Sequence, residues 1–127
     1  MSASPWSLRL SRLRERWAPG GADACVISSL VNIEYLTGLS ASAGLLVQAG
    51  EAAWLLLDGR YVTVAREMAA EGRLAPVTID PVGGPFDAAL HACLDRVGAG
   101  RVVFEPHHTT VATFERWRAL GPAREWV

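Results

Sequence analysis

The chain has 127 residues, of which 50% are hydrophobic and 20% are charged, and its formal net charge at pH 7 is −1. This composition is typical of one globular domain and excludes a disordered chain. Charges of both signs are spread along the sequence, which excludes the basic surface that nucleic-acid binding requires. The first residues lack an apolar signal-peptide run and no stretch is long enough to span a bilayer, so we expect a cytoplasmic protein without a membrane partner.

The amino-terminal segment predicts an amphipathic helix. Leu10, Leu13 and Trp17 recur at helical spacing, and Pro19-Gly20-Gly21 ends the pattern. Arg9, Arg12, Arg14 and Arg16 alternate with these residues, and because Glu15 interrupts the arginines we interpret this face as solvated rather than membrane-binding.

A strand and a short helix are predicted next. Ala24–Ser28 is an apolar run after a turn, which predicts a buried strand. Ser29 can cap a short helix that extends through Tyr35 and is closed by Gly38.

The most apolar stretch of the chain predicts a buried β-hairpin. Its strands are Ala43–Val47 and Ala52–Leu57, and Gly50 can supply the positive φ of the tight turn between them. Asp58-Gly59-Arg60-Tyr61 follows, where the second strand ends and a helix over Tyr61–Ala70 begins.

The second half of the chain alternates between strands and helices. The pattern predicts a strand at Ala75–Ile79, a loop at Pro81–Pro85, a helix from Phe86 to Val97, a strand at Arg101–Phe104, a helix from Val111 to Leu120 and the opening of a strand in Ala123–Val127. If the chain is a domain cut from a longer protein, we expect Trp126, in this last segment, to be exposed apolar surface that faced another domain. Alternation with a single hairpin predicts the α/β class, with a mixed β-sheet of about five to six strands flanked by helices.

Asp58 and Arg60 form the sharpest candidate site. A strand delivers Asp58 to the edge of the sheet, where open α/β sheets usually place their sites. The two side chains can pair, or one of them can reach a ligand. The alternative is that Asp58 caps the following helix, where the helix dipole favours a carboxylate, and we favour this structural role.

Asn32 and Tyr35 form the second candidate site, before the hairpin. Functionally, they can line a mouth that meets a peptide. Structurally, Asn32 would satisfy loop backbone groups, and Tyr35 would pack its ring with the hydroxyl at the surface, which is the role we favour.

A metal site within the chain is not expected. His107 and His108 are adjacent on a predicted loop and point in opposite directions, and His91 has no ligand at the usual spacing. A remaining alternative is a Mg²⁺ site built from three carboxylates that follow predicted strands, namely Asp58, Asp80 and Glu105. Cys25 and Cys93 lie in apolar segments without a neighbouring base, which predicts buried reduced thiols rather than nucleophiles or a disulfide.

Two motifs carry a family resemblance. Residues 32–47 read NIEYLTGLSASAGLLV, and residues 55–61 read LLLDGRY. In this order and spacing they resemble the N-terminal domain of the creatinase/prolidase family, most of all the Xaa-Pro aminopeptidases and dipeptidases (metallopeptidase family M24). Leu57 is the visible departure, since the family usually has Thr before this Asp.

The resemblance implies that residues 1–127 are one domain of creatinase/prolidase N-terminal type, with a ribonuclease H-like motif. It implies a non-catalytic domain of an Xaa-Pro peptidase-like metallohydrolase, whose C-terminal metallopeptidase domain is absent from this chain. In the family, that second domain binds two divalent metal ions (Mn, Co or Zn) through two Asp, one His and two Glu, and a metal-activated water cleaves peptide bonds next to proline. These residues contain no such ligand set, so we expect no peptidase activity from this chain alone.

The same resemblance implies two roles for the domain, which are association with a second subunit and shaping of the substrate mouth for a proline-containing peptide. Asn32, Tyr35, Asp58 and Arg60 are the candidate mouth residues. Creatine is disfavoured as a substrate, because residues 40–44 lack the Arg that creatine-cleaving members use. The alternative is a free-standing binding or dimerisation module without a catalytic partner.

Overall fold

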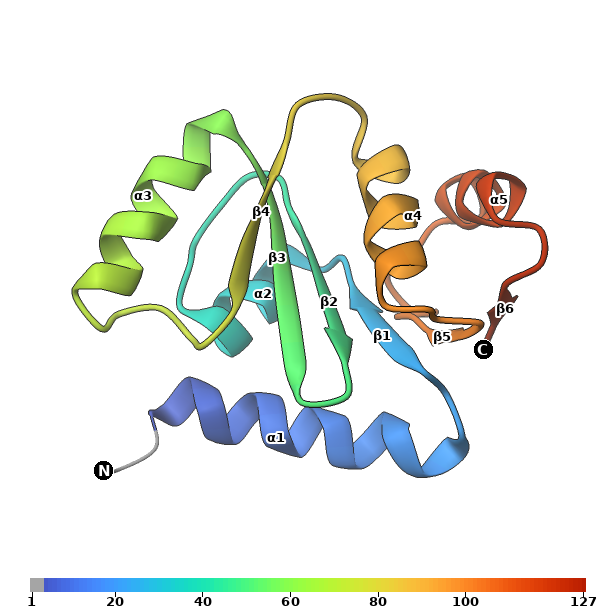
Figure 1. The fold of residues 1–127 in the computed structure, drawn as a ribbon, viewed down its shortest axis with the longest axis horizontal. Helices are drawn as coiled ribbons and strands as arrows, with labels where there is room; N and C mark the ends of the chain where they lie inside the picture. Colours follow the sequence, from blue (N-terminus) through green and yellow to red (C-terminus); the bar gives the residue numbers. More distant parts are fainter. Residues whose placement is uncertain (1–3) are drawn as a thin grey trace.

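The computed structural model describes residues 4–127, which form a mixed six-stranded sheet with helices on both faces (Figure 1). The strand order is β4-β3-β2-β1-β5-β6. The β1–β2 and β2–β3 pairs are antiparallel, and the other three pairs are parallel. The predicted α/β class and strand number are confirmed. The strands are β1 (Ala24–Ile27), β2 (Leu45–Ala49), β3 (Ala52–Asp58), β4 (Thr78–Val82), β5 (Arg101–Val103) and β6 (Glu125–Trp126).

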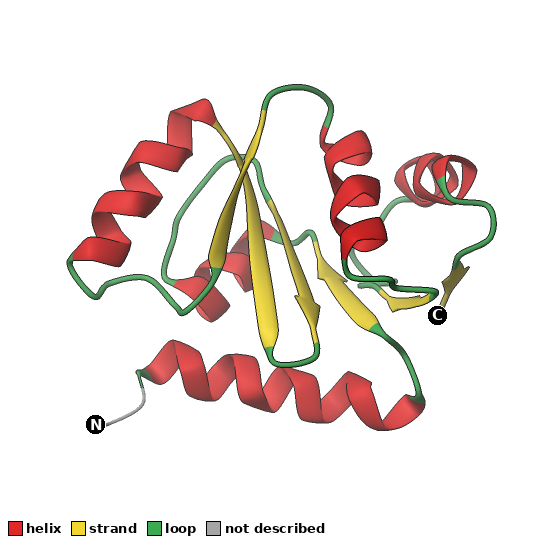
Figure 2. Cartoon of the chain, in the orientation of Figure 1, coloured by secondary structure: helices red, strands yellow, loops and turns green. Residues whose placement is uncertain are grey.

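The helices form two layers around the sheet (Figure 2). One face carries α1 (Pro5–Trp17), α2 (Leu30–Thr37) and α3 (Gly59–Ala70), with a 3₁₀ turn, η1 (Ala18–Gly20), after α1. The other face carries α4 (Phe86–Arg96) and α5 (Val111–Leu120). No helix within residues 4–127 combines the length and apolar character needed to cross a membrane.

The hydrophobic run of β3 supplies both cores because successive strand residues point to opposite faces. Leu55 and Leu57 pack beneath α1, α2 and α3, whereas Leu56 packs on the α4 side. All three side chains are fully buried. The predicted hairpin is confirmed, with Gly50 at a φ of +58° in its turn and Ala49 paired with Ala52.

The predicted strand at Ala75–Ile79 is wrong in position, because β4 begins at Thr78 and extends through Val82. Ala75 instead donates its backbone N–H to the carbonyl of Thr37, at 2.9 Å, in the loop that precedes the strand. Pro81, which predicted a loop, lies inside β4 opposite Leu57. A proline is tolerated there because β4 is the edge of the sheet, and its outward side has no neighbouring strand to accept a hydrogen bond.

Trp126 is not the exposed surface that the sequence predicts. It is half-buried and stacks on Trp117 with ring centroids 5.5 Å apart. Phe104 and Phe114 contact it edge-on at 6.1 and 6.5 Å. The short β6 strand pairs with β5 over only two residues, and this aromatic cluster stabilises its position.

The guanidinium of Arg124 fastens the same terminal segment to α4. It donates to the carbonyl of Ala99 (2.8 Å), to Nδ1 of His91 (2.8 Å) and to Oδ1 of Asp95 (2.6 Å). Because arginine stays protonated, Nδ1 must accept, which requires a neutral His91 ring. Burial of the ring, together with the Arg124 charge, lowers the pKa of His91 against the opposing effects of the Trp117 backbone and of the Asp95 and Asp87 charges.

The folded protein should therefore lose stability as the pH falls below about 6.5, the ordinary pKa of histidine, because the unfolded chain then takes up a proton that folded His91 resists. We expect the urea midpoint to be lower at about pH 5 than at about pH 7.5. His91→Gln should reduce this difference, whereas the matched change at exposed His108, His108→Gln, should preserve it. Equal pH dependence in all three proteins would contradict the assignment.

Candidate functional site

The loops that carry the candidate residues converge on the carboxyl-terminal edge of the sheet, where β1, β3 and β5 end. β1, β3, β4 and β5 all run in the same direction, and β2 runs against them. The carboxyl ends of β1, β3 and β5 therefore meet the loop that leads into β2. Two polar clusters lie along this edge, one around Asp58 and one around Glu105.

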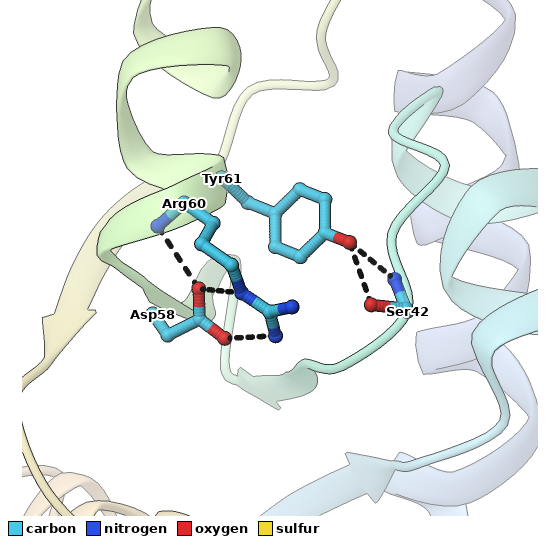
Figure 3. Close-up of polar contacts among 4 residues, drawn as sticks. All are labelled: Ser42, Asp58, Arg60 and Tyr61. Atoms are coloured by element: carbon cyan, nitrogen blue, oxygen red, sulfur yellow. Dashed lines mark hydrogen bonds and ion pairs between the residues drawn. The ribbon is translucent and has the colours of Figure 1, made fainter.

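The first cluster fixes the start of α3 (Figure 3). Asp58 is the N-cap of α3, and its Oδ1 accepts a hydrogen bond from the backbone N–H of Arg60 at 3.0 Å. The Arg60 side chain returns to the same carboxylate, with Nε 3.2 Å from Oδ1 and Nη2 2.9 Å from Oδ2. The hydrogen bonds and charge of Arg60 hold the pKa of Asp58 below its usual range. Both the predicted cap and the predicted Asp–Arg pair are present.

Tyr61 extends this cluster to the loop before β2 (Figure 3). Its phenolic oxygen accepts the backbone N–H of Ser42 at 3.1 Å and lies 2.6 Å from the Ser42 hydroxyl. These bonds lower the pKa of Tyr61, and the Arg60 guanidinium lies 5.2 Å from its ring centroid. Sequence reasoning missed both Ser42 and Tyr61 as partners. The available signal was their place in the two family motifs, since one lies in SASAG and the other ends DGRY.

The second cluster is built on Glu105, which directs its carboxylate at the start of α2. Oε1 accepts the backbone N–H groups of Ser28 (2.6 Å) and Ser29 (2.9 Å), and Oε2 accepts Nδ2 of Asn32 (2.6 Å). Loop backbone groups are thus satisfied by Glu105 and not by Asn32, which corrects the expected structural role of Asn32. Its side chain instead ties α2 to the segment after β5.

Tyr35 lies away from both clusters, one turn further along α2. Its ring is stacked by the Arg9 guanidinium at 4.1 Å from the centroid, and Arg9 also donates to the Tyr35 backbone carbonyl at 2.8 Å. The residue is 55% exposed. The four candidate residues therefore do not form a single site: Asp58 and Arg60 share one cluster, Asn32 belongs to the other, and Tyr35 faces α1.

Replacing Asp58 by alanine should lower the melting temperature by a few degrees, because α3 would lose its N-cap. Asp58→Asn keeps a capping side chain and should stay closer to the parent. Circular dichroism melts of the two variants would check this order, and a lower melting temperature for Asp58→Asn than for Asp58→Ala would contradict it.

The three carboxylates proposed to bind Mg²⁺ do not assemble. Asp80 lies within β4, not after it, and pairs with Arg96 at 2.6 Å. Asp58 and Glu105 are occupied by the partners described above. Residues 4–127 contain no group of three or more His, Cys, Asp or Glu side chains that could hold a metal ion. The family resemblance places the paired metal ions in the C-terminal domain, not in these residues.

The two cysteines are buried and unpaired by a disulfide. Burial, with a smaller effect from the charge of Glu105, raises the pKa of Cys25 to about 12. Burial also raises the pKa of Cys93. Both side chains are therefore neutral thiols at physiological pH, which are poor nucleophiles.

Fold and edge geometry together define an α/β/α domain whose polar edge is held by side chain–backbone contacts. A family model for the creatinase/prolidase N-terminal domain matches residues 9–127, and the chain belongs to this family. The N-terminal domain of cytoplasmic peptidase PepQ from Mycobacterium tuberculosis is similar at 30% identity with a TM-score of 0.79, covering 94% of this chain and 91% of that chain.

Two longer proteins are also similar to the chain. An uncharacterized peptidase, YqhT of Bacillus subtilis, is 28% identical over 94% of this chain and 33% of its own length. The Xaa-Pro dipeptidase from Bacillus anthracis has the same fold, with a TM-score of 0.85 at 17% identity over 96% of this chain and 33% of that chain. The chain thus spans about a third of the length of these two relatives.

Proposed function

We propose that this chain is the non-catalytic N-terminal domain of an Xaa-Pro peptidase-like metallohydrolase. The observation that carries the proposal is the family match over residues 9–127, together with relatives in which this domain is about a third of a peptidase. The metal ions would then be bound by the rest of that protein. One such neighbour is named a dipeptidase acting on Xaa-Pro substrates, which motivates a proline-containing peptide as the parent substrate.

In this proposal the polar edge of the sheet forms part of the substrate mouth. Asp58 and Ser42 hold Arg60 and Tyr61 at the rim, and Arg60 keeps 67% of its side chain exposed while paired. A guanidinium fixed in this way presents a free edge to an incoming carboxylate or carbonyl with little loss of side-chain entropy. Asn32 and Tyr35 would contribute from α2.

The purified chain should not hydrolyse an Ala-Pro dipeptide or a longer Xaa-Pro peptide, with or without added Mn²⁺, Co²⁺ or Zn²⁺. The physical reason is that residues 4–127 bring no three metal-ligating side chains together, so no metal-bound water can be generated. Product release measured by chromatography checks this. Cleavage above the buffer rate that follows the protein through purification would overturn the assignment as non-catalytic.

The source gene distinguishes this proposal from a free-standing binding or dimerisation module. Continuation of the reading frame beyond Val127 into a region with spaced Asp, Asp, His, Glu and Glu would support a peptidase, which we propose to be cytoplasmic. A stop codon directly after Val127 would favour the free-standing module. The mass of the protein in solution then tests the proposed association with a second subunit.

A further inference from the structure

A continuous groove runs along α1 on the face opposite α4. Two adjoining hollows, of about 660 and 470 Å³, share Leu13, Arg16, Ile27 and Glu105 among their lining residues. The groove, called the α1 groove below, has an apolar floor formed by α1, β1, β5 and the segment before β1. The floor includes Leu13, Ala22, Cys25, Ile27 and Val103.

Arginines line the α1 side of this groove. Arg9, Arg12 and Arg16 are spaced three and four residues apart, which places them along one side of the helix. Arg9 is already committed to Tyr35, through its stacked ring and its carbonyl. Arg12 and Arg16 are exposed and, among residues 4–127, make neither a hydrogen bond nor an ion pair.

The two carboxylates that line the groove, Glu15 and Glu105, make no ion pair with a described arginine. Both carboxylate oxygens of Glu105 accept hydrogen bonds, which come from Ser28, Ser29 and Asn32. Glu15 also lines the groove but is not within ion-pair distance of a described arginine. Two free guanidiniums therefore stand beside an apolar floor, an arrangement complementary to carboxylates separated by apolar side chains.

We propose that the α1 groove binds an acidic segment of a partner protein in extended conformation. Arg12 and Arg16 are one helical turn apart, a rise of about 6 Å. Alternate residues of an extended strand are separated by about 6.7 Å and point to the same side. A Glu-x-Glu pattern in such a segment can thus place one carboxylate at each guanidinium, while the intervening apolar residue turns toward the half-buried Val103.

Other occupants fit the groove less well. A nucleic acid presents a continuous row of phosphates, whereas Arg12 and Arg16 are the two arginines of this rim that lack a described partner. A membrane surface is flat, whereas the apolar residues here form the floor of a concavity. A second copy of this chain would need an acidic, protruding element, and its acidic side chains are scattered among basic ones. The proposal does not depend on a catalytic domain, and it remains testable whether or not the chain is part of a peptidase.

The test uses the peptide acetyl-Glu-Leu-Glu-Leu-Glu-Leu-amide, carrying a fluorophore, and its Lys-Leu counterpart. Anisotropy should show binding of the acidic peptide, weakened when NaCl rises from about 50 to about 500 mM, and no binding of the basic peptide. The double variant Arg12→Glu/Arg16→Glu should lose at least about tenfold in affinity, since two attractive rim contacts become repulsive.

The matched control is Arg66→Glu/Arg118→Glu, which makes the same charge change at exposed arginines on α3 and α5 that lack ion pairs. It should bind the acidic peptide within about twofold of the parent. Circular dichroism of both double variants verifies folding. Absence of binding, equal binding of the Lys-Leu peptide, or equal loss in both double variants would overturn the proposal.

Two further measurements address the competing occupants. If sedimentation shows a dimer that Arg12→Glu/Arg16→Glu dissociates, a second copy fills the groove and the proposal fails. If phosphatidylserine vesicles bind the protein through the same two arginines while the acidic peptide does not bind, the groove is an anionic-lipid site and the proposal also fails. A monomer that binds the acidic peptide and does not bind the vesicles supports the proposal.

Discussion

Replacing Glu105 by alanine is expected to lower the free energy of unfolding by about 3 kcal/mol. The carboxylate accepts two backbone N–H groups at the start of α2 and the Asn32 amide, all between 2.6 and 2.9 Å. A hydrogen bond to a charged group is worth about 1.5–3 kcal/mol, and the partly buried N–H groups of Ser28 and Ser29 would be left without a partner. Urea denaturation with a fixed m-value would measure the change.

Two variants calibrate this expectation. Glu115→Ala removes an exposed glutamate of α5 and should change the free energy of unfolding by less than about 0.5 kcal/mol. Asn32→Ala removes one of the three bonds and should cost about 1 kcal/mol. If Glu105→Ala were as mild as Glu115→Ala, Glu105 would not fasten α2 to the segment after β5.

Gly38→Ala should also destabilise the protein by about 3 kcal/mol. Gly38 ends α2 at a φ of +91°, a conformation that costs an L-residue about 1–2 kcal/mol. An added Cβ would also lie 2.9 Å from the backbone oxygen of Arg73 and 3.0 Å from the Trp6 ring. Because a backbone carbonyl cannot rotate away like the end of a flexible side chain, the clash must be relieved by moving the loop that carries Arg73.

Gly59→Ala is the matched control for Gly38→Ala. Gly59 begins α3 without a positive φ, and an added Cβ there meets no atom within 4 Å. Alanine at this helical position should leave the thermal midpoint unchanged or raise it slightly. A similar loss at both positions would show that conformation and crowding at Gly38 do not limit stability.

The sequence predicted elements wherever a local pattern is sufficient. The apolar runs around Gly50 identified the hairpin, and Ser29 and Gly38 marked the two ends of α2, because capping and turn chemistry depend on neighbouring residues. β4 was misplaced for the opposite reason. Whether Pro81 ends a strand depends on which side of that strand is unpaired, and strand order is a property of the whole sheet.

The contacts of the candidate site also divide into those that the sequence predicts and those that only the structure shows. Asp58 and Arg60 are two residues apart, so their pairing and the cap could be inferred from the sequence. The Tyr61–Ser42 contact joins residues 19 apart, and the Glu105 contacts join residues more than 70 apart. No periodicity links positions so distant, and Glu105 was considered only as a metal ligand.

The amino-acid sequence by itself determined the α/β class, the hairpin, the helix caps and the resemblance to the creatinase/prolidase N-terminal domain, because these are recorded in short-range patterns and motifs. Only the tertiary structure decided that Glu105 accepts hydrogen bonds from the start of α2 and that Trp126 packs against Trp117. It also decided that Arg12 and Arg16 lie beside an apolar groove without an ion-pair partner among the described residues. Those outcomes depend on which distant segments the sheet order brings together. They also depend on which charged side chains lack a partner after these segments have packed.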